Sequence, residues 1–434
     1  MNEHDISKAS EELGQNGDEL PEIHYCPTSK LQKYWKKDDR GLWIGYDIGA
    51  VRRYLKVRCG VKKQELSDEF LCNVENSKVI DVVTKISGYK KGMHRIDGKS
   101  VLVPSEQRRI KPVKGNWSTL EAFYLGMLGE EQFDWLKGWK KHWLDGFYNF
   151  KRNTGQVVVF VGPGSCGKTL EKDLLNHIFD GGGNPMRWIC GNTPYNGELC
   201  EYAHLNVDDE FQTLKADGKK NLKMYAKKVA VAGSQRFEFK HHQAFSASPL
   251  WRMTMACNGD PDSLSVIPEL DEHIKNKISI LHCVKRDMPM PSETSEEKAV
   301  FFNQLTKELP AFLYHLMYEH EVSEEMKDKE DRRMLVRGYH NPTVTKLAEE
   351  SSYDGQRMGA IIECLRETAQ GYEWVGTPTE LLKKVTPHGI ERNASPTSIG
   401  RLLTNRSKLP VDQVTCLGNK NGKRTYLINL REEE

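Results

Sequence analysis

The sequence GPGSCGKT at residues 162–169 directly follows QVVVFV, an apolar and β-branched run at 156–161. A short run of this kind is typical of a parallel strand that is buried on both faces. The eight residues fit the pattern G-x-x-x-x-G-K-T, and residues 168–179 have the pattern of a helix. Glycines let successive N–H groups converge on an anion, and the helix N-terminus adds positive potential. Strand, loop and helix together predict a P-loop that binds ATP and Mg²⁺.

The residue types of this loop suggest individual roles. We expect Lys168 to reach the β- and γ-phosphates and the Thr169 hydroxyl to hold Mg²⁺. We expect the Cys166 side chain to face away from phosphate, although its modification would block the nucleotide. The expected nucleotide contacts comprise the whole loop and the next residue: Gly162, Pro163, Gly164, Ser165, Cys166, Gly167, Lys168, Thr169 and Leu170.

A second candidate element lies about 40 residues further on, where the sequence reads LNVDDE at 205–210. An apolar strand that ends in carboxylates can supply a metal ligand and a group that polarises the attacking water. The pattern assigns Mg²⁺ to Asp209 and the water to Glu210. Asp208 fits the metal role equally well on sequence grounds.

A third strand, WRMTMACN at 251–258, ends in a polar amide. Beside a P-loop, Asn258 could position the attacking water and would count with Lys168 and Glu210 as catalytic. The pair Asn258-Gly259 also fits an ordinary turn.

Alternation of strands and helices around these elements predicts an α/β fold with a mostly parallel sheet. We divide the chain into a disordered acidic tail (1–25), an α+β region of unknown role (26–115), a helical collar (116–150), an ATPase core (151–295), a helical linker (296–350) and a winged-helix domain (351–434). The last assignment rests on three helices followed by two strands around GNKNGK, a turn of hairpin type.

The order and close spacing of the three elements resemble the superfamily 3 helicases, especially the poxvirus and phage type of primase-helicase. The likeness covers roughly residues 120–290 and includes KKVAVAGSQRFEFKHHQ (227–243), which is similar to that family's basic hairpin. The resemblance implies an AAA+-like ATPase that forms a homo-hexameric ring. It also implies that Lys240, His241 and His242 grip single-stranded DNA in the channel. An exposed hairpin without function, or a metal site at the His pair, are the alternatives.

One departure from that family concerns the residue that acts on a neighbouring subunit's ATP. The family places an arginine finger shortly after the asparagine strand, whereas this chain reads LDEHIKNKISIL at 270–281. Lysine supplies charge without a bidentate fork. The candidates are therefore Lys275, Lys277, Arg252 and Arg286.

The expected winged helix would bind duplex DNA through the helix at 396–405, with Arg401 and Arg406 as principal contacts. Ser398, Asn405, Lys420, Lys423 and Arg424 are further candidates. A winged helix that makes protein contacts only is the alternative.

Bulk composition narrows the class of protein. The net charge is +2, no apolar run is long enough to span a bilayer, and ten scattered cysteines suggest a reducing compartment. We therefore expect a cytoplasmic protein of a bacterial or virus-infected cell. The sequence favours a replicative DNA helicase over an ATP-switched origin-binding loader that does not unwind DNA.

Overall fold

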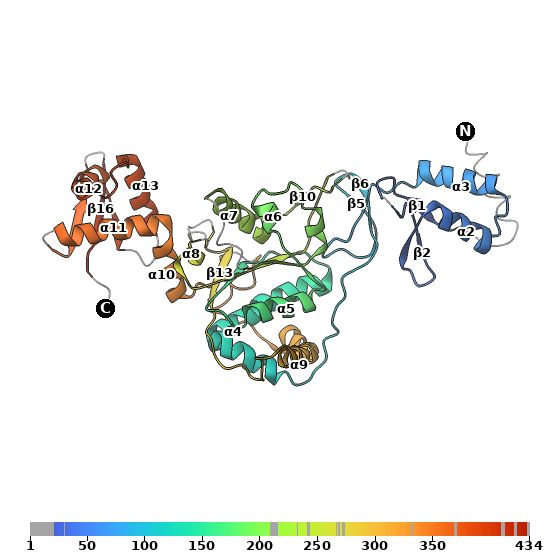
Figure 1. Cartoon of the computed structure of the whole chain (residues 1–434), viewed down its shortest axis with the longest axis horizontal. Helices are drawn as coiled ribbons and strands as arrows, with labels where there is room; N and C mark the ends of the chain where they lie inside the picture. Colours follow the sequence, from blue (N-terminus) through green and yellow to red (C-terminus); the bar gives the residue numbers. More distant parts are fainter. Residues whose placement is uncertain are drawn as a thin grey trace.

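The computed structural model describes most of the chain, with the backbone alone at 216–220 and at 420; the described residues are 21–29, 31–208, 216–231, 233–240, 244–265, 267, 270, 274–330, 333–368, 371–408, 413–420 and 423–431. Figure 1 shows an amino-terminal unit in blue, a large central unit, and a carboxy-terminal unit in orange and red. Within these residues, no helix is both long and apolar enough to cross a bilayer.

The central unit is built on a five-stranded sheet whose order is β13-β7-β12-β9-β8, with every pair of neighbours parallel. Its strands are β7 (Val157–Val161), β8 (Gly182–Gly183), β9 (His204–Val207), β12 (Arg252–Cys257) and β13 (Ile278–His282). The three strands predicted from the sequence are thus neighbours, with β12 between β7 and β9. Their carboxyl ends lie at one edge, where the phosphate loop follows β7.

Alternate side chains of β7 enter two separate hydrophobic clusters. Val157, Val159 and Val161 pack with α7 (Ala216–Val231) on one face of the sheet. Val158 and Phe160 pack with α4 (Ser118–Asn149), α5 (Lys168–Ile178) and α9 (Ser295–Tyr314) on the other. Figure 1 shows these two helical layers above and below the sheet. Burial on both faces explains why the strand lacks polar residues.

The segments expected as a collar and a linker both contribute to the lower layer. Helices α4 and α9 share one hydrophobic cluster with β7 and α5, so the boundaries placed at 150 and 295 run through a single core. Helix α4 is interrupted at Gly129, whose φ of 73° and ψ of 172° are non-helical. Only glycine adopts such angles without strain.

A buried charged cluster joins α4 to α5. The Lys140 ammonium lies 2.9 Å from Glu171 Oε1, and both side chains are almost wholly inaccessible to solvent. The Tyr124 hydroxyl donates to Glu171 Oε2 at 2.7 Å, and Lys140 Nζ donates to the Tyr124 oxygen at 2.6 Å. Burial lowers the pKa of Lys140 while the Glu171 carboxylate opposes that shift. This cluster fixes the helix that begins at the phosphate loop.

Shorter elements complete the central unit: α6 (Met186–Ile189), a 3₁₀ turn (Gly197–Glu201), β10 (Gln235–Phe237), β11 (Phe245–Ala247), α8 (Pro261–Leu264), a π-helical turn (His315–Glu319) and α10 (Pro342–Ser351). Gly182 and Gly183 form the edge strand β8, and the Gly181 N–H donates to the Asn176 carbonyl at 2.7 Å beyond the end of α5. Helix α5 has already ended at Ile178.

Two small sheets lie between residues 23 and 103, so the segment expected as a disordered tail (1–25) ends in a strand whose Ile23 is buried. The first joins β1 (Ile23–Tyr25), β2 (Tyr34–Lys37) and β3 (Trp43–Tyr46) and is covered by α2 (Ile48–Arg58) and α3 (Gln64–Ser77). The second joins β4 (Val82–Val83), β5 (Gly92–Ile96) and β6 (Lys99–Val103). The stretch 43–55 contains the strand β3 and most of the helix α2.

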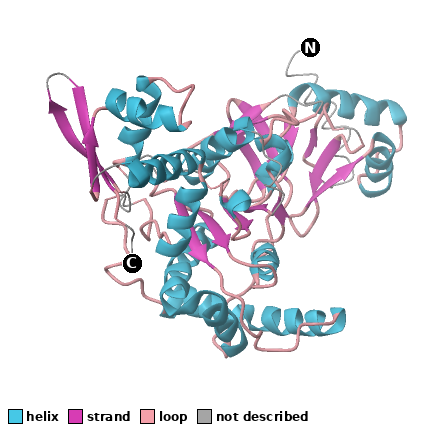
Figure 2. Ribbon diagram, turned by 60° about the vertical axis from the view of Figure 1, so that its left-hand side comes forward, coloured by secondary structure: helices cyan, strands magenta, loops and turns pink. Residues whose placement is uncertain are grey.

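The carboxy-terminal unit contains α11 (Tyr353–Thr368), β14 (Glu373–Gly376), α12 (Pro378–Val385), a 3₁₀ turn (Thr386–His388), α13 (Pro396–Arg406), β15 (Val414–Lys420) and β16 (Lys423–Asn429). Its sheet is antiparallel in the order β14-β16-β15, and the hairpin of β15 and β16 projects from the unit in Figure 2. Thr377 caps the amino terminus of α12, with a reciprocal bond to Glu380.

Candidate functional site

The glycine loop at 162–167, the predicted phosphate loop, leaves β7 at the carboxyl edge of the sheet and turns into α5. Two of its glycines are required by their surroundings. A Cβ at position 162 would lie 2.1 Å from the carbonyl oxygen of Cys283. Gly167 has a φ of 107°, and a Cβ there would lie 2.8 Å from the Phe123 ring. The loop is therefore held between β13 and α4, and no side chain can replace either hydrogen.

Lys168, the first residue of α5, turns its ammonium back into the loop. Lys168 Nζ donates to the carbonyl of Gly162 at 2.5 Å and to that of Pro163 at 2.9 Å. It also lies 3.3 Å from Asn258 Oδ1, and only 7% of the residue is exposed. The structure thus brings together Lys168 and the amide at the end of β12, which the sequence separates by 90 residues. A turn function for Asn258 alone does not explain this contact.

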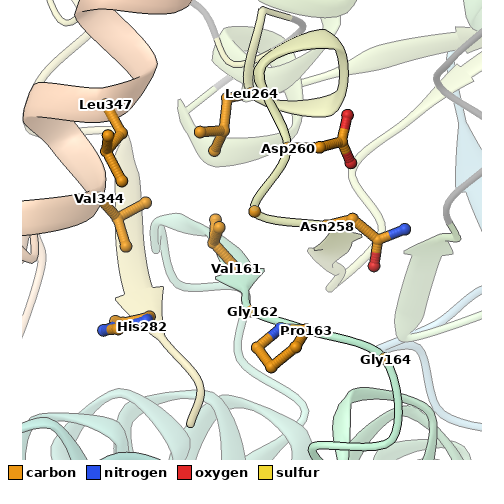
Figure 3. A pocket seen from close by; sticks show the side chains of 11 residues that line it. Val161, Gly162, Pro163, Gly164, Asn258, Asp260, Leu264, His282, Val344 and Leu347 are labelled. Atoms are coloured by element: carbon orange, nitrogen blue, oxygen red, sulfur yellow. The ribbon is translucent and has the colours of Figure 1, made fainter.

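A cavity of about 480 Å³ opens beside the loop. Its apolar side chains come from three directions, as Figure 3 shows: Val161 at the end of β7, Leu264 on α8, and Val344 and Leu347 on α10. Polar groups line the rest, namely the loop backbone at 162–164, Asn258, Asp260 and His282. Cavities with this mixture of an apolar wall and a few polar groups suit small ligands that carry a ring and a charged end.

The Cys166 thiol belongs to the interior rather than to the exposed face of the loop. It is 2% exposed, lies 3.9 Å from Lys168 Nζ and hydrogen-bonds with the Cys283 thiol. The bond to Cys283 and the Lys168 charge lower the pKa of Cys166 to about 6. Burial raises the pKa of Cys283.

The acidic candidates are only partly described. Asp209 and Glu210 lie outside the described residues, so their expected roles at Mg²⁺ and water stay predictions. Asp208 follows β9 directly, and its carboxylate accepts from Lys172 Nζ of α5 at 2.9 Å. Asp208 is therefore on the side of the sheet that faces the P-loop helix. Thr169 is exposed at the start of that helix. A hydroxyl and carboxylates are the hard oxygen ligands that Mg²⁺ prefers, so these residues fit the ion.

The expected basic hairpin is a hairpin in the structure. Strands β10 and β11 pair with Phe237 opposite Phe245, and both phenyl rings are fully buried. The Asn196 side chain fixes the first strand of this hairpin, because it donates to the Arg236 carbonyl and accepts from the Glu238 N–H. Lys240 lies exposed at the turn, whereas His241 and His242 lie outside the described residues. The charged tip therefore stands on a rigid base.

Two of the sequence assignments need correction. Arg252 cannot act on a neighbouring subunit, because its guanidinium is 1% exposed and bonds to the carbonyls of Asn153 and Thr154 at 2.9 and 2.8 Å. Burial lowers its pKa to about 9. Arg406 cannot be a principal DNA contact, because it continues the buried stripe of α13 that contains Ile399, Leu402 and Leu403. Arg401, on the opposite side of that helix, is exposed as expected.

The other finger candidates occupy different edges of the sheet. Lys275 is exposed and Lys277 is half-buried just before β13, level with residue 157 at the amino end of β7. Neither can reach the phosphate loop of its own chain, which follows the opposite end of β7. Arg286 is exposed three residues after Cys283, on the edge that holds the loop.

Sequence reasoning did not find the wall of the cavity or the buried support of α5. Val344 and Leu347 come from a helix nearly 180 residues after the loop, and an apolar pair on an amphipathic helix is ordinarily core. Nothing in the sequence indicates that Lys140 and Glu171 form a buried pair, because charged residues on helices are ordinarily exposed.

No protein-family model and no curated protein sequence matches this chain. The apo structure of the NrS-1 C-terminal region (305–718) is similar in shape, with a TM-score of 0.58 over 99% of this chain and 100% of that one at 14% identity. Two A-form apo structures of the same region give TM-scores of 0.55 and 0.53, each covering 97% of this chain and 98% of the other at 12% identity. The whole chain thus shares the fold of the NrS-1 C-terminal region.

Proposed function

We propose that this chain is a P-loop ATPase and that it acts as a ring-forming DNA helicase in replication. The observation that carries the ATPase is the position of the Lys168 ammonium. It is enclosed by a glycine loop at the end of a buried parallel strand, with Asn258 of the neighbouring strand beside it. Carbonyl oxygens are weaker partners for an ammonium than phosphate oxygens are, so a triphosphate can displace them.

In this proposal the phosphates lie over 162–169 and the base enters the apolar part of the cavity. Lys168 neutralises charge that develops on the γ-phosphate, and Asn258 orients the attacking water. Thr169 and the carboxylates after β9 would hold Mg²⁺, which supplies charge neutralisation between the phosphates. Glu210 would accept the proton of the water.

The apolar wall gives a test of where the base binds. We expect Leu347→Ser to weaken ATP binding roughly fivefold, since it removes about 1 kcal/mol of apolar contact. Leu347 is 44% exposed, so the change leaves the core intact. Isothermal titration calorimetry measures the affinity for ATP and for pyrophosphate. Pyrophosphate lacks the base, so the comparison separates the contribution of the base to binding from that of the phosphates.

Pyrophosphate should bind the Leu347→Ser protein as it binds the wild type, and Leu347→Met should bind both ligands normally. Equal ATP affinity in the serine variant would place the base elsewhere.

The exposed hairpin suggests how hydrolysis could be coupled to DNA. A ring of six copies would present six Lys240 tips to a single strand, and movement of the rigid hairpin would draw that strand through the channel. We expect Lys240→Ala to keep the ATPase rate within about twofold while strand separation on a forked duplex is lost.

Arg236→Ala is the matched control for Lys240→Ala. Arg236 lies on the same hairpin and is exposed, but its guanidinium pairs with Glu238 at 2.9 Å near the base. Unwinding that survives Lys240→Ala would disprove the channel assignment. Unwinding that fails equally in both variants would disprove the specific role of the tip.

A second candidate function is an ATP-switched DNA-binding loader that does not unwind. The burial of Arg252 favours it, because one of the two arginine candidates for a trans-acting finger is removed. In that case the carboxy-terminal unit, with its three helices and its hairpin, would act as a winged helix and bind duplex DNA through Arg401. A forked duplex with 3′ and 5′ tails distinguishes the two functions, because a loader binds it without separating the strands.

A further inference from the structure

Part of the amino-terminal unit has a strong excess of positive charge, and this charge has no role in the proposed helicase. Residues 31–63 contain ten Lys and Arg against three Asp, a local charge of +7 in a chain whose net charge is +2. The next helix, α3, has the opposite charge, since it contains four acidic residues and no basic residue. The unit stands away from the central sheet in Figure 1, with α2 and α3 on its outer side.

Some basic side chains on and around α2 contact other residues of the unit, and others do not. Arg52 faces α3 and pairs with Asp68 at 2.7 Å. Lys36 of β2 covers the Tyr54 ring at 4.4 Å. Arg53, Lys56 and Arg58 are exposed, as are Lys62 and Lys63 in the loop to α3. Among the described residues, no carboxylate forms an ion pair with any of these five.

The fold alone does not account for the five exposed charges. Basic residues in the last turn of a helix complement its dipole, and this explains Lys56 and Arg58. It does not explain Arg53 in the middle of the helix or Lys62 and Lys63 beyond its end.

The chemistry of the face indicates the class of partner. The centres of protein interfaces are depleted of lysine. If a second copy of the chain paired its α3 with this face, the exposed acidic residues of that helix would be Glu65 and Glu69. Helices that lie in a membrane surface present a row of large apolar groups to it, but the exposed large apolar residues of α2 are Val57 and, at its first position, Ile48. Closely spaced lysines and arginines with few apolar neighbours suit a polymer of regularly spaced phosphates.

We propose that the α2 face, defined as Arg53, Lys56, Arg58, Lys62 and Lys63, binds the phosphate backbone of nucleic acid. Binding there is independent of base sequence, since no exposed aromatic or amide group of the face reads a base. The site goes beyond the proposed motor, because it needs neither ATP nor the Lys240 hairpin.

The test is fluorescence anisotropy without nucleotide on the full chain, using a single-stranded oligonucleotide and a duplex of the same sequence. The variant replaces three charges: Arg53→Gln, Lys56→Gln and Arg58→Gln. We expect roughly tenfold weaker binding and a salt slope smaller by about 2, near 0.7 per lost contact on a single strand. The probe that loses more affinity identifies the form of nucleic acid that the face holds.

The matched control removes the same number of charges from the exposed surface of α9 and the segment after it: Lys298→Gln, Lys307→Gln and Lys329→Gln. It should bind both probes like the wild type. Wild-type affinity and salt slope in the α2 variant would overturn the proposal. So would a change in its sedimentation mass without DNA, which would make the face a contact between subunits. The ATPase rate of the α2 variant is measured in parallel and stays normal, so failure here is distinct from failure of the motor.

Discussion

Replacement of Lys168 by alanine is expected to lower the rate of ATP hydrolysis by two to three orders of magnitude or more, the size of effect seen when one preorganised transition-state donor is removed. The reason is geometric. Lys168 Nζ lies between the carbonyls of Gly162 and Pro163 and the amide of Asn258. Among the described residues, no second ammonium or guanidinium contacts these three groups. Steady-state phosphate release measures the effect.

Two further variants separate chemistry from folding. Lys168→Arg keeps the charge, yet its larger planar head does not fit a position that is 7% exposed, so it should also be inactive. Lys227→Ala removes an exposed lysine from α7 and should hydrolyse ATP normally. If Lys168→Ala retained a rate within about threefold of the wild type, Lys168 would not stabilise the transition state.

The second large effect is on stability. Lys140→Met leaves the Glu171 carboxylate buried without its ammonium, and we expect the free energy of unfolding to fall by about 3–5 kcal/mol. Urea denaturation, monitored by tryptophan fluorescence, measures this loss of stability, because Trp139 and Trp143 lie in the hydrophobic cluster that also contains Tyr124.

Lys137→Met provides the control one helical turn earlier. Its ammonium pairs with Asp134 at 2.9 Å near the surface, so its loss should cost at most about 1 kcal/mol. The double variant Lys140→Met with Glu171→Leu should recover most of the lost stability, because neither charge then remains buried. A single variant as stable as the control would show that the buried pair contributes nothing.

The sequence predicted the parts of the site that depend on local pattern. The strand at 157–161, the glycine loop and α5 lie where the motif placed them, because backbone conformation in a phosphate loop is specified by the glycines themselves. The strands that end near Asp208 and Asn258 were also found, since short apolar runs with polar ends mark buried parallel strands.

What could not be predicted depends on contacts between distant segments. Arg252 begins a strand, and nothing in its neighbours shows that Asn153 and Thr154 supply carbonyls to bury it. The glycines at 182 and 183 look like a breaker, yet they pair with β9 because only a residue without a side chain fits beside Tyr202 and Asn176. Arg406 lies seven residues after Ile399 on α13, and its charge suggested exposure although its helical position faces inward.

The break at Gly129 has a mechanical consequence. The part of α4 before it forms the floor of the phosphate loop, since Phe123 and Met127 lie against Gly167 and the Met127 carbonyl accepts from Val284 at 2.9 Å. The part after it is anchored by Lys140. Tyr124 on the short arm bonds both to Lys140 on the long arm and to Glu171 of α5, so a ligand that contacts residue 167 acts on two arms that one buried cluster holds together. The short arm is also continuous with the chain that leads back to the amino-terminal unit, so one stretch of backbone connects the floor of the loop to that unit.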